Sequence, residues 1–96
     1  MKVENNQVLG ANDEHLMFFE TNALTNGSNM FYQTSLASFS GDLSSLVNGY
    51  MMFSSTSLTS FSGDLSSLTD GNSMFSHNSS LTSFSGDLSS LVDGNS

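Results

Sequence analysis

The stretch Ser57–Leu68, SLTSFSGDLSSL, decides the fold because the chain carries it three times. It recurs unchanged at Ser80–Leu91 and, with one residue different, at Ser35–Leu46. Successive copies begin 22 and then 23 residues apart. A unit this short cannot bury an apolar face by itself, so we expect neighbouring units to stack and to share one core. The repeat therefore predicts a solenoid.

The order of residues within one unit predicts its local structure. Two-residue alternation predicts a short strand that points Phe61 inward and Ser60 and Ser62 outward. The aspartate and serines that follow favour an Asx-turn. At the next turn we expect Gly71 to take a positive φ, and residues 72–76 to form one turn of 3₁₀ or short helix. The predicted class is a strand-dominated α/β solenoid, leucine-rich-repeat-like, with one short parallel strand per 22–23-residue unit.

Stacking in register turns each apolar position of the unit into a column. The expected columns are Leu36/Leu58/Leu81, Phe39/Phe61/Phe84, Leu43/Leu65/Leu88, Leu46/Leu68/Leu91 and Phe31/Phe53/Phe75. Residues 24–96 form the predicted array, which stops within a unit. Residues 1–23 are irregular, and we expect them to form a degenerate N-terminal rung or cap, with residues 14–20 as its strand region.

Composition narrows the classes of partner. Lys2 is the only basic residue against nine acidic ones, which gives a formal net charge of −8. Nothing in the chain could neutralise phosphates, so neither nucleic acid nor an anionic membrane is an expected partner. No stretch is apolar enough for a signal peptide or for membrane insertion. The chain stops in the middle of a unit, which favours a piece of a longer exported protein over a cytoplasmic protein. The expected location is therefore extracellular or at a cell surface.

The motif of the unit also points to a family. The pattern L-x-x-F-x-G, a second apolar pair and then Met-Phe, as at Met52-Phe53, resembles the BspA-like leucine-rich repeats of bacterial surface proteins. The resemblance covers Leu24–Ser96. It implies a right-handed solenoid with one parallel strand per unit, display on a cell surface and a role in adhesion. Many of those repeats carry a Cys shortly after the Phe, where this chain has Thr34, Thr56 and Asn78.

The sequence does not predict an enzyme. His15 and His77 are the only histidines, neither repeats, and no nucleophile motif accompanies them. The aspartates Asp42, Asp64 and Asp87 recur in every unit and are expected to cap turns, with calcium binding as the alternative. No metal or cofactor site is predicted.

The candidate ligand site is the row of outward-facing serines. Its residues are Ser38, Ser40, Ser60, Ser62, Ser83 and Ser85. We expect a non-enzymatic surface-array module that uses this face for adhesion or for binding a protein or a glycan. The alternatives are a solvated face on a purely structural spacer of a stalk or fibre and, more remotely, an ice-binding hydroxyl array. A docking patch at residues 17–19 is a further alternative.

The C-terminal end generates a last expectation. Leu88, Leu91 and Val92 lie in the final unit with no following unit to cover them. One end of the array would present an apolar cross-section, and the other end a different surface. Unlike ends can associate head to tail, and such contacts form open filaments unless the chains close into a ring. We therefore expect self-association through the C-terminal end, opposed by the net charge of −8.

Overall fold

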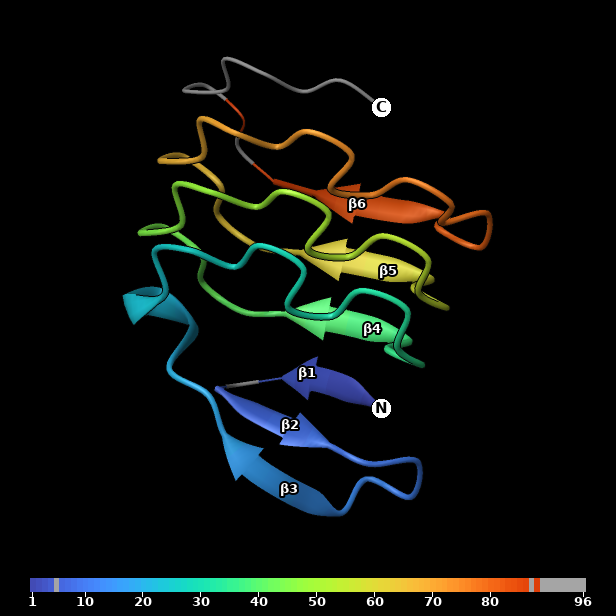
Figure 1. Ribbon diagram of the computed structural model, residues 1–96. Coiled ribbons are helices and arrows are strands. Elements are labelled where there is room, and N and C mark those ends of the chain that lie inside the picture. Colours follow the sequence, from blue (N-terminus) through green and yellow to red (C-terminus); the bar gives the residue numbers. More distant parts are fainter. Residues whose placement is uncertain (5, 87, 89–96) are drawn as a thin grey trace.

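A computed structural model describes residues 1–4, 6–86 and 88. It is a strand-dominated mixed sheet with almost no helix, which is compatible with the predicted strand-dominated α/β class (Figure 1). The strands are β1 (Lys2–Glu4), β2 (Gln7–Leu9), β3 (His15–Phe18), β4 (Ser38–Ser40), β5 (Ser60–Ser62) and β6 (Ser83–Ser85). They lie in the order β3-β2-β1-β4-β5-β6. Among the described residues the helical element is η1, a 3₁₀ turn at Thr21–Ala23.

The repeated units contribute the parallel half of the sheet. Strands β4, β5 and β6 pair in parallel so that each residue lies beside its own counterpart, Phe39 beside Phe61 and Phe61 beside Phe84. The turns repeat the same pairing outside the strands. Gly27 N–H donates to the carbonyl of Asn48, one unit on, at 2.8 Å. Adjacent units are therefore hydrogen-bonded at equivalent positions both in the sheet and on the opposite side of each unit.

Residues 1–23 contribute the antiparallel half, and their strands differ from the expectation. The strand that extends the parallel ladder is β1, in which Val3 lies beside Phe39 and is buried. Residues 14–20 were expected to fill this place, but β3 lies at the far edge of the sheet, beyond β2. The physical reason is the alternation of Lys2-Val3-Glu4, which buries one apolar side chain between two polar ones, as the Ser-Phe-Ser strands do.

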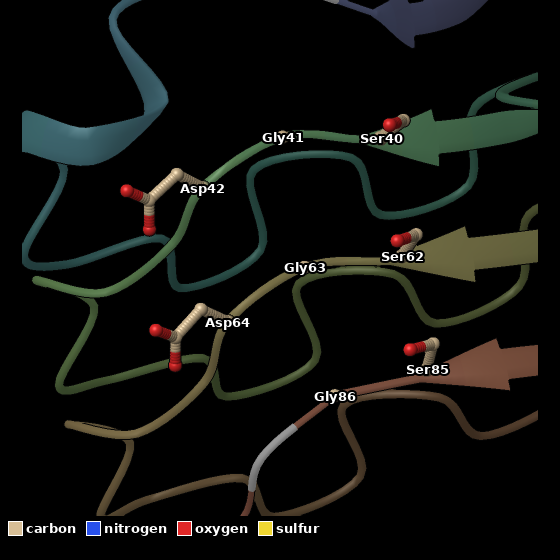
Figure 2. Close-up of a pocket in the computed structure, with 8 residues that line it drawn as sticks. All are labelled: Ser40, Gly41, Asp42, Ser62, Gly63, Asp64, Ser85 and Gly86. Atoms are coloured by element: carbon tan, nitrogen blue, oxygen red, sulfur yellow. The ribbon is translucent and has the colours of Figure 1, made fainter.

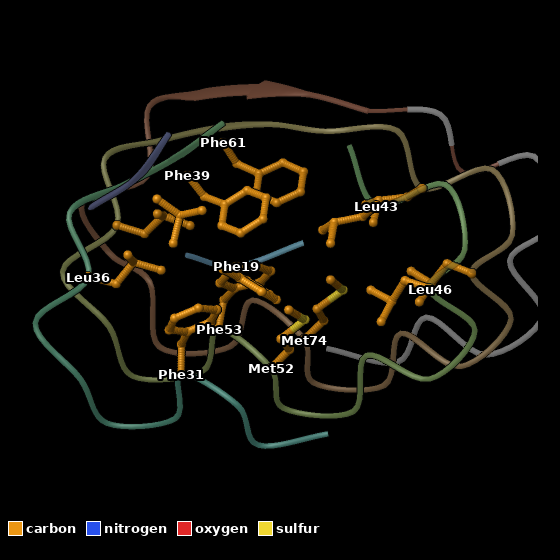
Figure 3. Close-up of a cluster of buried hydrophobic side chains, with 14 of the residues drawn as sticks. Phe19, Phe31, Leu36, Phe39, Leu43, Leu46, Met52, Phe53, Phe61 and Met74 are labelled. Carbon is orange, nitrogen blue, oxygen red and sulfur yellow. The ribbon is translucent and has the colours of Figure 1, made fainter. Parts of the chain in front are cut away.

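The core is built from two columns of phenylalanine (Figure 3). Phe39 and Phe61 stack with ring centroids 5.3 Å apart in the column under the strands. Phe31 and Phe53 stack at 5.7 Å in the column that faces it. Rings from different columns meet edge to face, as Phe53 and Phe61 do at 5.4 Å. Leucines, methionines and, in the N-terminal part, Val3 and Val8 fill the rest of the core. The buried leucines and methionines of this cluster are Leu36, Leu43, Leu46, Leu58, Leu65, Leu68, Met52 and Met74.

The expected apolar columns hold in the middle of the stack and weaken toward its last described unit. Leu81 and Phe75 are only partly buried, and Phe84 and Leu88 are 43% and 41% exposed. Leu91 and Val92, which the sequence analysis placed at an uncovered end, lie outside the described residues. The two units that begin at Ser35 and Ser57 therefore supply the most completely buried side chains.

The aspartates that follow β4 and β5, Asp42 and Asp64, form the predicted Asx-turns. The Asp42 carboxylate accepts a hydrogen bond from the Ser44 N–H at 2.8 Å. The Asp64 carboxylate does the same with Ser66 at 2.9 Å. A second Asx-turn recurs in the described units: the side-chain oxygens of Asn26, Asn48 and Asp70 accept from the N–H two residues on, at 3.0, 2.9 and 3.1 Å. Side-chain oxygens thus hold both corners of the unit.

The prediction of a positive φ at Gly71 is wrong. Across the described residues no glycine has a positive φ, and the left-handed residue comes two positions later, at Met51 and Ser73 in successive units. The glycine instead leaves room for the next unit: a Cβ on Gly49 would lie 2.9 Å from Sδ of Met74, the far part of a flexible side chain. The left-handed residue also prevents the helical turn that was expected at residues 72–76. This segment forms hydrogen-bonded turns instead.

Asn78 takes over the place of a threonine in the longer third unit. Thr56 donates its hydroxyl to the Phe53 carbonyl at 3.1 Å. One unit on, the side-chain oxygen of Asn78 accepts from the Thr56 backbone N–H at 3.2 Å, and its amide nitrogen donates to the same Phe53 carbonyl at 2.9 Å. Asn78 thus gives the Thr56 N–H a partner and the Phe53 carbonyl a second one, so these groups stay paired in the unit that carries the inserted residue.

Truncation of the central aromatic ring should separate core from surface. We expect Phe61→Ala to lower the free energy of unfolding by about 3–5 kcal/mol, because a side chain only 1% exposed leaves a cavity between two stacked rings. The adjacent Ser62→Ala should change it by less than about 0.5 kcal/mol. Urea titrations of both variants measure the difference. Equal losses for the two variants would contradict this assignment of inside and outside.

Candidate functional site

The structure brings all six predicted site serines together on one sheet surface. Ser38, Ser60 and Ser83 form one row across β4, β5 and β6, because the register pairs each with the next. The register forms a second row in the same way, made of Ser40, Ser62 and Ser85. We call the two rows together the serine face. Side chains of the second row are exposed, whereas Ser38 and Ser60 are half-buried. The second row is therefore the more accessible part of the serine face.

A shallow groove of about 450 Å³ runs along the second row (Figure 2). The hydroxyls of Ser40, Ser62 and Ser85 stand at equivalent places at the ends of their strands. A glycine follows each serine, and the Asp42 and Asp64 carboxylates come next in the same direction. The groove thus offers hydroxyl donors and acceptors along one side and negative charge along the other.

The glycines of the groove are required by the close approach of neighbouring units. Gly41 N–H donates to the Ser62 carbonyl at 3.1 Å, and Gly63 N–H donates to the Ser85 carbonyl at 3.0 Å. A Cβ on Gly63 would lie only 2.8 Å from the Gly41 carbonyl oxygen, and one on Gly86 only 3.0 Å from the Gly63 carbonyl oxygen. The absence of side chains here keeps the units in contact and leaves the groove floor as bare backbone.

The carboxylates at the groove are already used by the fold. One oxygen of Asp42 and one of Asp64 accept the turn N–H groups described above. Asp87, the third member of the column, lies outside the described residues. Within the described part of the chain, no cluster of three or more histidine, cysteine, aspartate or glutamate side chains is arranged to hold a metal ion. Turn capping accounts for the geometry of Asp42 and Asp64.

His15, one of the two histidines, does not join the serine face. His15 lies on β3, which β2 and β1 separate from β4 in the sheet. Its Nδ1 lies 3.0 Å from Oε1 of Gln7, so its ring is held on the antiparallel part of the sheet. The His15 imidazole is therefore held away from the hydroxyls of the serine face.

Sequence reasoning gave too little weight to a second surface at the N-terminal end of the stack. An apolar hollow of about 300 Å³ lies there, lined in part by Met17, Phe19 and Phe31. Of the residue run 17–19, Phe19 is buried in the core, whereas Phe18 is 79% exposed. The signal in the sequence was the apolar run Leu16–Phe19 itself, which is uninterrupted where the repeats alternate.

Enlarging one groove glycine should loosen the contact between units. We expect Gly63→Ala to lower the free energy of unfolding by about 1–3 kcal/mol, because the new methyl group meets a backbone oxygen that cannot turn away. Gly49→Ala is the matched control, since its methyl group meets the flexible thioether of Met74. Urea midpoints compare the two. A loss for Gly49→Ala that equals or exceeds the loss for Gly63→Ala would refute this role for the backbone contact.

Calcium should not act on the aspartate column. Because Asp42 and Asp64 each spend an oxygen on their own turn, millimolar calcium should raise the melting temperature no more than sodium chloride of equal ionic strength. Thermal unfolding followed by circular dichroism measures this. A rise specific to calcium that Asp64→Asn abolishes would make the column a metal site and overturn the turn-capping assignment.

Two further findings concern membrane-spanning helices and similarity to known proteins. In residues 1–4, 6–86 and 88, no helix has the length and apolar character needed to span a bilayer. Comparison of the chain with protein-family models, with curated proteins and with solved structures finds no significant match. The resemblance to BspA-like repeats therefore rests on the motif of the unit alone.

Proposed function

We propose that the chain is a leucine-rich-repeat-like solenoid, a non-enzymatic module of a longer cell-surface protein that binds a polar protein or glycan through the serine face. The solenoid is supported by the equal register of β4, β5 and β6 and by the hydrogen bonds between equivalent turns. Each 22- or 23-residue step places the same side chain beside its counterpart. Such an arrangement extends a surface feature of one unit into a row.

The single observation that carries the binding role is the exposed row of Ser40, Ser62 and Ser85 along the groove. Neighbouring strands stand roughly 4.8 Å apart, so the hydroxyls recur at that interval. Each hydroxyl can donate one hydrogen bond and accept others, which suits sugar hydroxyls and extended peptide backbones alike. Ordering a serine side chain costs little conformational entropy. Most of the free energy of each new hydrogen bond would therefore contribute to ligand binding.

A purely structural spacer is the second candidate, and the core favours it. The phenylalanine columns and the turn hydrogen bonds account for the stability of the unit without any ligand. In a spacer the serines would only keep the face soluble. The two candidates differ in one measurable respect, which is whether adhesion depends on the exposed serine row.

A charge placed on the serine face tests the binding role. We expect Ser62→Lys to weaken adhesion of the purified protein to glycan arrays and immobilised matrix proteins by about tenfold or more, because the long side chain covers the groove. Ser57→Lys is the control, since Ser57 is also exposed, lies outside both rows and gives the same change of charge.

Both variants should keep the urea midpoint of the parent protein, which separates recognition from folding. Unchanged adhesion by Ser62→Lys, or an equal loss with Ser57→Lys, would reject the serine face as a binding site and favour the spacer.

A further inference from the structure

The outer edge of β3 is an exposed apolar strand. All residues of β3 are exposed, and Leu16, Met17 and Phe18 are 54%, 56% and 79% exposed. One edge of β3 pairs with β2, and β3 is the last strand of the sheet on that side (Figure 1). Natural proteins protect such an edge with proline or lysine, but this chain has no proline and its one lysine lies on β1. The edge is therefore open to pairing with another strand.

An apolar hollow adjoins this edge. Its floor consists of buried core residues, among them Val8, Phe19 and Phe31. Its rim includes Met17 from β3 and Met30, which is itself exposed. The hollow holds about 300 Å³, enough for one large apolar side chain. Because Met17 belongs to both features, a strand added to β3 would bring its own side chains to the mouth of the hollow.

Negative charge flanks the exposed apolar run at both ends. Asp13 and Glu14 precede β3, and Glu20 follows it, all three exposed. Lys2 pairs with Asp13 at 3.3 Å and lies 3.9 Å from Glu4. Each ion pair of the described residues thus involves that one lysine, and Glu14 and Glu20 take part in neither. A partner that carries positive charge at both ends of an apolar segment would complement this edge.

We propose that β3 and the hollow bind an extended segment of another protein, in which apolar side chains alternate with lysine or arginine. The segment pairs its backbone with the free edge of β3, as in strand addition. One apolar side chain enters the hollow beside Met17, and basic side chains face Glu14 and Glu20. This surface is separate from the serine face, since β2 and β1 lie between β3 and β4.

A second copy of this chain is a poorer occupant. An antiparallel pairing of two β3 strands centred on Met17 would set Glu14 of each copy against Glu20 of the other. Like charges directly opposite on paired strands are destabilising, and each copy carries a net charge of −8. The basic partner relieves the same repulsion that the second copy would create.

Selection from a phage-displayed library of random linear peptides on the full chain tests the proposal. We expect the enriched peptides to alternate apolar residues with lysine or arginine. A selected peptide, synthesised with a fluorescent label, should lose affinity by about tenfold or more when Phe18→Ser or Met17→Ser is introduced. Val47→Ser is the matched control, since Val47 is 45% exposed and lies outside both features, and it should leave the affinity unchanged.

The backbone pairing and the charge complementarity between peptide and β3 are tested by separate controls. Methylation of alternate backbone nitrogens of the peptide should abolish binding, because it removes the donors of the strand pairing. Affinity should fall as salt rises. Enriched peptides without basic residues, equal binding of the methylated peptide, equal losses in Val47→Ser and Phe18→Ser, or no enrichment at all would overturn the proposal. So would sedimentation of the free chain as a dimer that Phe18→Ser dissolves, which would assign the edge to a second copy.

Discussion

The structure depends on the contact between each core phenylalanine and the same phenylalanine one unit away. Phe61 stacks on Phe39 and on Phe84 with ring centroids 5.3 Å apart in both cases. The second column, through Phe53 and Phe75, repeats this contact at 5.3 Å and meets the first column edge to face. Offset stacking and edge-to-face contact are the arrangements that aromatic rings prefer. The rings therefore favour one separation and one register between units.

That register determines which side chains lie side by side on the surface of the parallel half of the sheet. Once Phe39 lies beside Phe61, the serines on either side of each ring must also lie beside their counterparts. Gly63 and Gly86 then lie against the backbone of the neighbouring unit, and a Cβ on Gly63 would come within 2.8 Å of a backbone oxygen. The serine face and the groove are consequences of core packing. Their regularity by itself does not distinguish a binding surface from a spacer, which is why the test of function has to disturb the face without disturbing the rings.

Sequence alone was sufficient where a pattern repeats. It predicted the inward Phe61, the outward serine rows and the Asx-turns at Asp42 and Asp64, because equivalent positions share one environment. It was insufficient where a single copy exists. Three residues of alternation in β1 are too short a signal to identify the strand that continues the ladder. The exposed edge at β3 depends on which strands pair, and the room left by Gly49 is explained only by Met74, a residue in the next unit.

The in-register pairing of neighbouring units can be measured by disulfide trapping, because the chain has no cysteine of its own. Ser40 and Ser62 are direct neighbours across β4 and β5, where parallel strands stand roughly 4.8 Å apart, within the range that a disulfide spans. We expect Ser40→Cys with Ser62→Cys to form an intramolecular disulfide under mild oxidation. Ser40→Cys with Ser60→Cys, two residues out of register and more than about 7 Å apart, should stay reduced. Cross-linking of the second pair in preference to the first would contradict the in-register pairing of β4 with β5.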